Sequence, residues 1–261
     1  MTLPRLTIII PTWNENAHLP GLLAQLRAQV GVTMEILVAD GGSRDGTRET
    51  TQRAGAHLIQ AAPGRGAQMN AAARRAKGAE LLFLHADSGL SDPCLLQQAL
   101  AALDRFRATR GYRCAGHFKL RFVEQPPGHE GLFHYYAEKS ALNRRECFNG
   151  DQGLLLSRIF FAELGGFSEE FPFLEDQQLG VQIIRLGHWL TLPGILETSA
   201  RRFAQEGVAR RILLNGLIMA CFHTEFREFP RQAPALYRSQ DKNDRLRLAP
   251  FFRLVWRLNR T

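Results

Sequence analysis

Short apolar runs alternate with helix-like segments over about the first ninety residues, and this alternation limits the fold more than any other feature of the sequence. Four apolar runs predict buried strands at residues 6–10, 36–39, 57–59 and 81–84. Helix-like intervals lie near residues 19–30, from residue 47 onward and at residues 67–77. Strands separated by helices in this way favour a parallel sheet with right-handed crossover connections.

The second half of the chain is less regular but carries signals of the same kind. Residues 115–123 and 153–157 predict strands, and residues 175–186 predict a helix. No linker or internal repeat interrupts the chain before about residue 225. We therefore expect one mixed α/β domain over residues 1–225, followed by a basic, aromatic-rich helical segment over residues 226–261.

The positive charge of the chain is concentrated at its C-terminal end. The sequence has 33 Lys and Arg residues against 25 Asp and Glu, a net charge of +8. Residues 227–261 hold nine of these basic residues and three of the acidic ones, which leaves a charge of only +2 for residues 1–226. A nearly neutral body is not expected to bind nucleic acid across its surface.

The sequence predicts a cytoplasmic protein. The apolar run at residues 6–10 is shorter than the core of a signal peptide. The longest later apolar stretch, residues 212–222, is interrupted by Asn215 and is too short to cross a bilayer. Four cysteines lie too far apart for a zinc ribbon or a redox pair, and we expect free thiols: Cys94, Cys114, Cys147 and Cys221.

Polar side chains follow three of the four predicted strands. They are Thr12 and Glu15 after the first strand, Asp40 and Gly41 after the second, and His85 and Asp87 after the fourth. In doubly wound α/β sheets, ligands bind at the carboxyl ends of the strands. The three polar ends together therefore predict a ligand site at this edge of the sheet.

Asp40 has two readings. It directly follows a strand and precedes glycines that let another molecule approach the backbone, where an acid typically hydrogen-bonds a nucleotide. The alternative is that Asp40 satisfies a turn or caps the next helix. For Asp45 we expect only this second, structural role.

Asp87 is the candidate metal ligand. A carboxylate at a strand end is a hard oxygen ligand that suits Mg²⁺ or Mn²⁺ beside a diphosphate. If the strand continues, the side chain of His85 lies on the same face as that of Asp87. An imidazole ligand would favour Mn²⁺ over Mg²⁺. The alternatives for His85 are a ribose contact, a water contact or simple packing.

Carboxylates and arginines elsewhere in the chain supply further candidates. Glu175 and Asp176 open the predicted helix at residue 175, where the helix dipole stabilises carboxylates and where a general base could face an acceptor. Arg65 and the pair Arg201 and Arg202 are candidates for holding a phosphate or a base. An isolated arginine is more often solvated, and the sequence leaves both readings open.

Taken in order, these motifs resemble the family-2 glycosyltransferases of GT-A fold from about Leu6 to Gly187. The motifs are Ile10-Pro11-Thr12-Trp13-Asn14-Glu15, Ala39-Asp40-Gly41-Gly42-Ser43-Arg44-Asp45-Gly46-Thr47, His85-Ala86-Asp87, Gly165-Gly166-Phe167 and Glu175-Asp176. A closer likeness is to the short "transferase 2" proteins associated with radical-SAM enzymes and selenodomains, which are also named for arsenosugar biosynthesis. That likeness rests on the segments at residues 64–70, 83–87, 150–153 and 198–203.

The resemblance implies a metal-dependent, inverting transfer of one sugar from a nucleotide-diphosphate donor, with UDP as the expected nucleotide. It implies that the donor is bound by Thr12, Glu15, Asp40, Gly41, Arg65, His85, Arg201 and Arg202. It places Gln152, with Gly150 and Asp151, beside the acceptor. Asp87 would hold the Mn²⁺ or Mg²⁺, and Asp176, with Glu175, would supply the catalytic base.

Two departures from the family's pattern restrict this expectation. His85 stands where the family's Asp-x-Asp motif begins, which affects the identity of the metal. A Gln-x-x-Arg-Trp acceptor motif is missing, so we expect a small or lipid-linked acceptor in place of a growing polysaccharide.

The C-terminal segment interleaves apolar and aromatic residues with arginines, from Arg245 to Arg260. Such a segment can lie on an anionic membrane surface. The alternative is a helix that packs its apolar face on the domain and leaves its arginines in water.

Other functional classes fit less well. A Rossmann dehydrogenase or a nucleotidyltransferase would carry a glycine-rich loop after the first strand, where this chain has Pro11-Thr12-Trp13-Asn14. A non-catalytic nucleotide-sugar-binding or scaffold protein remains the alternative, because His85 would suit a degenerate site. A nucleic-acid binder acting through the tail is a third reading.

Overall fold

The computed structural model describes residues 3–144, 147–169, 174–224, 226, 228–238 and 247–258. Over these residues, no helix is both long enough and apolar enough to cross a membrane. Residues 170–173, just before the predicted helix at residue 175, and the part of the basic tail at residues 239–246 lie outside the described residues.

One seven-stranded sheet organises the chain, in the order β3-β2-β1-β4-β6-β5-β7. The strands are β1 Leu6–Thr12, β2 Met34–Asp40, β3 His57–Gln60, β4 Glu80–Phe83, β5 Cys114–Val123, β6 Leu154–Ser157 and β7 His188–Ser199. The helices are α1 Leu19–Arg27, α2 Thr47–Arg53, α3 Arg65–Ala73, α4 Leu95–Arg110, α5 Glu130–Ser140, α6 Arg158–Glu163, α7 Glu175–Leu186, α8 Arg201–Glu206, α9 Val208–His223, α10 Glu228–Arg238 and α11 Ala249–Leu258. A single 3₁₀ turn, η1, covers Gly150–Gln152.

The sheet is mainly parallel, which confirms the predicted α/β class. Strands β3, β2, β1 and β4 run in parallel, and so do β5 and β7. Strand β6 is antiparallel to both β4 and β5 and joins the two parallel groups. Because β1, β2 and β4 are parallel neighbours, the loops that follow them meet at one edge, as predicted.

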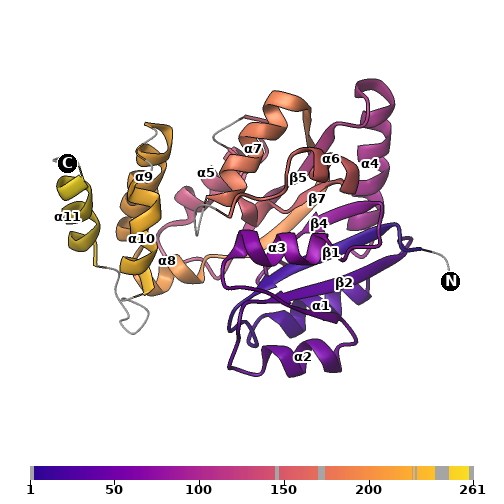
Figure 1. The fold of residues 1–261 in the computed structure, drawn as a ribbon, viewed down its shortest axis with the longest axis horizontal. Coiled ribbons are helices and arrows are strands. Elements are labelled where there is room, and N and C mark those ends of the chain that lie inside the picture. The colour runs from indigo at the N-terminus through magenta and orange to yellow at the C-terminus, as the bar shows by residue number, and fades with distance from the viewer. Residues whose placement is uncertain are drawn as a thin grey trace.

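Helices cover both faces of the sheet, which gives the domain two hydrophobic cores (Figure 1). In β1, Ile8 and Ile10 pack in the core shared with α1 and α4, whereas Ile9 packs in the core shared with α3, α6 and α7. Side chains alternate between the faces of a strand. A continuous apolar run therefore suits a strand that is buried on both sides, as in parallel sheets.

Most predicted elements of the first half lie where the sequence placed them, with one local correction. Helix α2 begins at Thr47 as predicted, but its N-cap is Gly46, with φ of +90°, and not Asp45. Asp45 still contributes, because its Oδ1 accepts a hydrogen bond from the backbone N–H of Thr47 at 3.1 Å.

The last helices form a third hydrophobic core, which lies to one side of the sheet in Figure 1. Helices α9, α10 and α11 contribute buried side chains that include Leu214, Phe229 and Phe251. Leu174, which directly precedes α7, joins the same core. The boundary predicted after residue 225 thus falls between α9 and α10, two helices that pack together, so the basic segment shares its core with α9.

Candidate functional site

The loops that follow β1 and β2 are joined by hydrogen bonds. The backbone N–H of Asn14 donates to Oγ of Ser43 at 2.8 Å, and the N–H of Arg44 donates back to Oδ1 of Asn14 at 2.9 Å. The N–H of Glu15 donates to Oγ1 of Thr47 at 3.0 Å. These contacts fix two of the three predicted polar strand ends relative to each other.

The carboxylate of Asp40 is buried and bound by its own turn. It accepts hydrogen bonds from the N–H groups of Gly42 and Ser43 and an ion pair from Nε of Arg48 at 2.7 Å. Burial alone would raise the pKa of Asp40, but the contacts with Ser43, Arg48 and Gly42 lower it below its usual value. This placement matches the turn-satisfying role that the sequence left open.

Gln68 of α3 ties the ends of β1 and β2 together. Its buried Nε2 donates to the carbonyl oxygens of Thr12 and Ala39, each at 2.7 Å. A side chain at Gly41 would meet the Gln68 amide at 3.0 Å, so only glycine fits there without a shift. Thr12 is buried, and among the described residues its hydroxyl has no hydrogen-bond partner.

Arg201, at the start of α8, lies between Glu15 and Asp87. Its Nη2 lies 3.0 Å from Oε2 of Glu15 and 3.4 Å from Oδ2 of Asp87. All three side chains are about one-fifth exposed. One guanidinium thus connects the polar ends of β1 and β4.

His85 pairs with Asp151 of η1. Its Nδ1 lies 2.7 Å from Oδ1 of Asp151. Burial alone would lower the pKa of His85, but the hydrogen bond and the charge of Asp151 raise it above its usual value. Conversely, burial would raise the pKa of Asp151, but the contact with His85 holds it well below its usual range. Both shifts favour the charged forms of the two side chains.

Arg65 and Glu175 form a second ion pair, with Nε of Arg65 at 2.7 Å from Oε1 of Glu175. Glu175 is buried, and its Oε2 has no hydrogen-bond partner among the described residues. Burial raises the pKa of Glu175, with a smaller contribution from the charge of Asp176, and these effects outweigh the charge of Arg65. An enclosed carboxylate of this kind is poorly placed to reach a substrate.

Asp176 is held at the amino end of α7 by backbone groups. Its Oδ2 accepts the N–H of Gly150 at 2.6 Å, and its Oδ1 accepts the N–H of Gln177 at 2.8 Å. A β-carbon at position 150 would lie 3.2 Å from Oδ2 of Asp176 and 2.9 Å from Nε2 of His85. Gly150 therefore lets the acid and the imidazole approach the same point.

Two more arginines lie close to Asp151. The charge of Arg202 contributes to the low pKa of Asp151. Arg211 of α9 pairs with Glu206 at 3.0 Å. Burial lowers the pKa of Arg211, and the charge of Arg202 adds to this effect, whereas Glu206 and Asp151 oppose it. The site is therefore rich in both signs of charge.

Gln152, predicted to border the acceptor, faces the protein interior. Its side chain is fully buried, Nε2 donates to the carbonyl of Ser140 at 2.6 Å, and Oε1 accepts the N–H of Asn149 at 2.7 Å. Both ends of the amide are engaged by the chain. Gln152 thus anchors the loop that carries Asp151 and is a correction to its predicted place at the ligand.

Among the described residues, no complete set of metal ligands is formed by the protein alone. No group of three or more His, Cys, Asp or Glu side chains within them is arranged to hold a metal. Mg²⁺ is commonly held by one or two carboxylates together with substrate phosphates. Asp87, partly exposed at the end of β4, fits that arrangement, whereas His85 directs Nδ1 at Asp151.

The structure gathers the predicted site residues in two neighbouring groups. One contains Thr12, Glu15, Asp87 and Arg201 at the ends of β1, β4 and β7. The other contains Arg65, His85, Glu175 and Asp176. The sequence analysis did not single out Arg48, Gln68 and Arg211; the partners of Gln68 lie 29 and 56 residues away, whereas Arg48 and Arg211 pair with acids only eight and five residues away.

Comparisons with known proteins agree with this architecture. The sequence model described as glycosyl transferase family 2 matches residues 7–163, which include the polar ends of β1, β2 and β4. Among curated protein sequences, none matches the chain significantly.

Solved structures resemble the fold at low sequence identity. One is TarS residues 1–349 from S. aureus in complex with UDP. It aligns with a TM-score of 0.56 and 18% identity, covering 75% of this chain and 60% of that one. A mannosyltransferase, PcManGT from Pyrobaculum calidifontis, in complex with GDP-Man and Mn²⁺, aligns with a TM-score of 0.54 and 22% identity, covering 76% and 57%. The chain spans only 35% of a longer TarS structure. At these identities the likeness concerns the fold alone.

Proposed function

Because the chain belongs to glycosyl transferase family 2, we propose that it transfers one sugar from a nucleoside-diphosphate donor, with UDP as the first candidate. The observation that carries the proposal is the charged row across the carboxyl ends of the strands. It runs from Glu15 through Arg201 to Asp87 and on to the His85–Asp151 pair and Asp176. We also retain the radical-SAM-associated subgroup as a proposal, on the motifs at residues 64–70 and 150–153.

The donor's nucleoside would lie over the loops after β1 and β2. Glu15 supplies carboxylate oxygens there, Thr12 contributes a buried hydroxyl that has no partner among the described residues, and Asp40 acts indirectly by holding the turn at Gly41–Ser43. The hydrogen bonds between the two loops keep this surface in one shape before the donor arrives. Preorganisation of this kind lowers the entropy cost of binding.

Asp176 is proposed as the general base. Its carboxylate would take the proton of an acceptor hydroxyl while that oxygen attacks the anomeric carbon. The bond to the diphosphate breaks with its electron pair, and the sugar's configuration inverts. Backbone N–H groups fix Asp176, yet each of its oxygens keeps a lone pair for the proton. Glu175 is assigned to support, since it is enclosed with Arg65.

Arginines would stabilise the charge that develops on the leaving diphosphate. The guanidinium of Arg201 lies beside Asp87, which follows β4, and its N–H donors match the geometry of phosphate oxygens. Arg65 and Arg202 add positive charge on the side of Asp151. Fixed charges aimed at a developing negative charge are among the largest contributions to enzymatic rate.

We propose that Asp87 would hold a divalent cation, Mn²⁺ or Mg²⁺, beside the donor's diphosphate. When bound, such a cation supplies Lewis-acid stabilisation of the diphosphate. The role of this chain is to present the Asp87 carboxylate beside Arg201 at the strand edge. Arg201 then has to share Asp87 with the cation or turn towards the phosphates.

For the acceptor, we propose a small or lipid-linked molecule approached from the side of Asp151 and Asp176, with the protein peripheral to a membrane. The support is the basic helical segment at the C-terminus, whose helix α11 exposes Phe252 and Trp256.

Release of the nucleoside diphosphate tests the proposal. The protein is incubated with UDP-, GDP-, CDP- and TDP-sugars, Mn²⁺ and a lipid extract, and the released diphosphate is measured. Release that Asp176→Asn abolishes, and that the exposed control Asp104→Asn retains, would support the transferase. Binding of a donor without release would favour the non-catalytic binding or scaffold alternative, and no binding at all would contradict both.

A further inference from the structure

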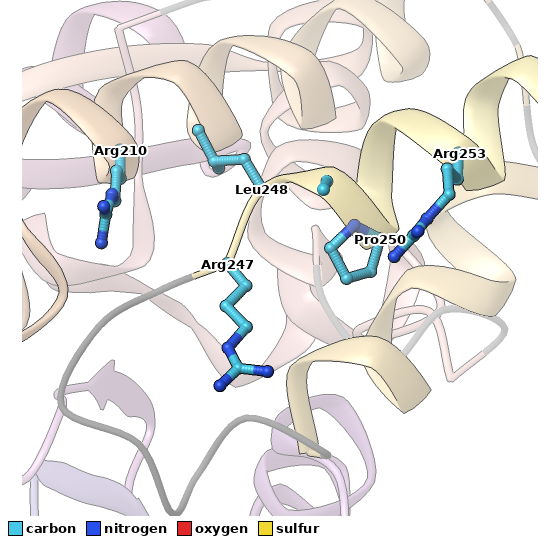
Figure 2. A pocket seen from close by; sticks show the side chains of 6 residues that line it. Arg210, Arg247, Leu248, Pro250 and Arg253 are labelled. Carbon is cyan, nitrogen blue, oxygen red and sulfur yellow. The ribbon is translucent and has the colours of Figure 1, made fainter.

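The structure has a pocket between the C-terminal helices, separate from the charged row at the strand edge. Arg210 of α9 lines it together with Arg247, Leu248, Ala249, Pro250 and Arg253 at the start of α11 (Figure 2). Its volume is about 350 Å³, near the lower limit of small-molecule sites. The lining of the pocket thus combines three arginines with the apolar side chains of Leu248, Ala249 and Pro250.

The described residues that line this pocket include three arginines and no acidic side chain. Neither α9 nor α11 contains an Asp or Glu residue. In the first turn of α11, the backbone N–H groups of Phe251 and Phe252 are bonded to the carbonyl of Leu248. The arginine side chains therefore supply the donors for a ligand, and guanidinium groups favour phosphate oxygens.

Exposed aromatic side chains lie beside the pocket on α11. Phe251 and Leu254 are buried in the third core, whereas Phe252 is 49% and Trp256 is 61% exposed. On the helix, Phe252 and Trp256 are four residues apart and so lie on one face, next to Arg253. Aromatic rings beside arginines on one exposed helix face are typical of segments that lie in a membrane interface.

Helix α9 adds an apolar side chain to the same neighbourhood. Leu213, three residues after Arg210 and so on the same side of the helix, is 55% exposed. Arg211, which directly follows Arg210, pairs with Glu206 and interacts electrostatically with Asp151. Adjacent residues of α9 thus connect the pocket with the acceptor side of the candidate site.

We propose that the pocket formed by Arg210, Arg247 and Arg253 binds the phosphate of an anionic membrane lipid, while Phe252 and Trp256 enter the membrane interface. This inference deepens the proposed membrane contact and is independent of donor binding. Its consequence is an orientation: the acceptor side of the site, beside Arg211 and Asp151, would lie next to the membrane surface.

Vesicle flotation tests the inference on the full chain. Vesicles of phosphatidylcholine alone are compared with vesicles that also contain phosphatidylglycerol. We expect binding to the second kind only. Because each basic residue near an anionic surface strengthens binding about fivefold, Arg210→Gln, Arg247→Gln and Arg253→Gln together should weaken it roughly 100-fold.

A matched control separates the pocket from net charge. Arg75 after α3, Arg105 on α4 and Arg185 on α7 are exposed, and replacing all three with Gln removes the same charge. The control should keep most of the binding. Equal losses in the two triple variants would overturn the proposal, because bulk charge would then explain the binding.

Two further measurements sharpen the result. Phe252→Ser with Trp256→Ser should weaken vesicle binding at high salt, where the contribution of charge is screened. UDP binding should stay unchanged in all these variants, so that failure here is distinct from failure of the donor site. Binding to RNA but not to phosphatidylglycerol vesicles would overturn the lipid assignment.

Discussion

Nη2 of Arg201 lies 3.4 Å from Oδ2 of Asp87, the carboxylate proposed to hold the cation. The same nitrogen lies 3.0 Å from Glu15, so one positive charge stands between the ends of β1 and β4. The proposed diphosphate and cation would enter at this point. The guanidinium is therefore placed to exchange its carboxylate partners for phosphate oxygens.

Replacing Arg201 with Gln should weaken the binding of UDP about 10- to 100-fold, because a hydrogen bond between charged groups contributes roughly 1.5–3 kcal/mol. Isothermal titration with UDP and Mn²⁺ measures the change. Arg185→Gln, on the exposed surface of α7, is the control and should bind as the wild type does. An unchanged affinity in Arg201→Gln would show that the diphosphate lies elsewhere.

Asp176→Asn should lower the transfer rate about 10²- to 10⁴-fold, the usual contribution of a general base. The amide keeps an oxygen that can accept the N–H of Gly150, so UDP affinity should change little. Measuring the rate and the affinity on the same sample separates the two effects. A rate that falls only as far as the affinity falls would assign Asp176 to binding.

Arg65 and Glu175 form an ion pair in which Glu175 is buried and Arg65 is partly exposed. Arg65→Met leaves the carboxylate of Glu175 buried and unpaired, which should cost about 3 kcal/mol of unfolding free energy, near the low end for such pairs because Arg65 is partly exposed. The double variant Arg65→Met/Glu175→Met should recover much of that loss. Urea unfolding is measured on the wild type, Arg65→Met, Glu175→Met and the double variant, and simple addition of the two single losses would contradict a direct pairing.

The strand ends could be predicted from the sequence because the signal is local. Thr12, Asp40 and Asp87 directly follow or lie close after apolar runs, and parallel neighbours bring such ends to one edge. The helix at α7 could be predicted for the same reason, since its apolar spacing and its two opening carboxylates lie within one segment.

Strand β7 escaped prediction because Pro193 and Gly194 interrupt it. The structure accommodates both in a bulge opposite β5, where the register shifts between Phe118 and Lys119. Gly194 has a φ of +86°, which favours glycine. Arg201 was a candidate from the sequence, but its contacts with Glu15 and Asp87 depend on where β7 ends. Helix α4, by contrast, has helically spaced leucines and could have been predicted.

The side-chain contacts of Asp40 and Gln152 could not be read from their own sequence motifs. The sequence left open whether Asp40 binds a nucleotide or its own turn; the structure shows the contacts with the turn and an ion pair with Arg48, eight residues later, and the nucleotide contact stays a prediction. Likewise, Gln152 looked like a ligand-facing residue in its motif. Its burial follows from Ser140 and Asn149, which no local pattern reveals.

His117 should make stability depend on pH. Burial lowers its pKa, against a smaller opposing effect of the hydrogen bond with Asn143. Between that lowered value and about 6.5, the unfolded chain binds more protons than the folded one, so this residue's contribution to stability is lost as the pH falls. Thermal unfolding at pH 7.5 and 5.5 should show a smaller acid loss for His117→Phe, which keeps ring contacts with Phe148 and Trp189. An equal loss in both proteins would contradict this assignment.

The most direct test of the donor site is a thermal-shift titration with UDP, with and without Mn²⁺, on the wild type, Asp87→Asn and the exposed control Asp104→Asn. Ligand at about 100 times its Kd stabilises a protein by roughly 2.7 kcal/mol, which corresponds to a rise in Tm of roughly 5 °C or more for a chain of this size. We predict a Mn²⁺-dependent rise in the wild type and in Asp104→Asn that Asp87→Asn largely loses. No rise with UDP, or an equal rise in all three proteins, would contradict a nucleoside-diphosphate site at the end of β4.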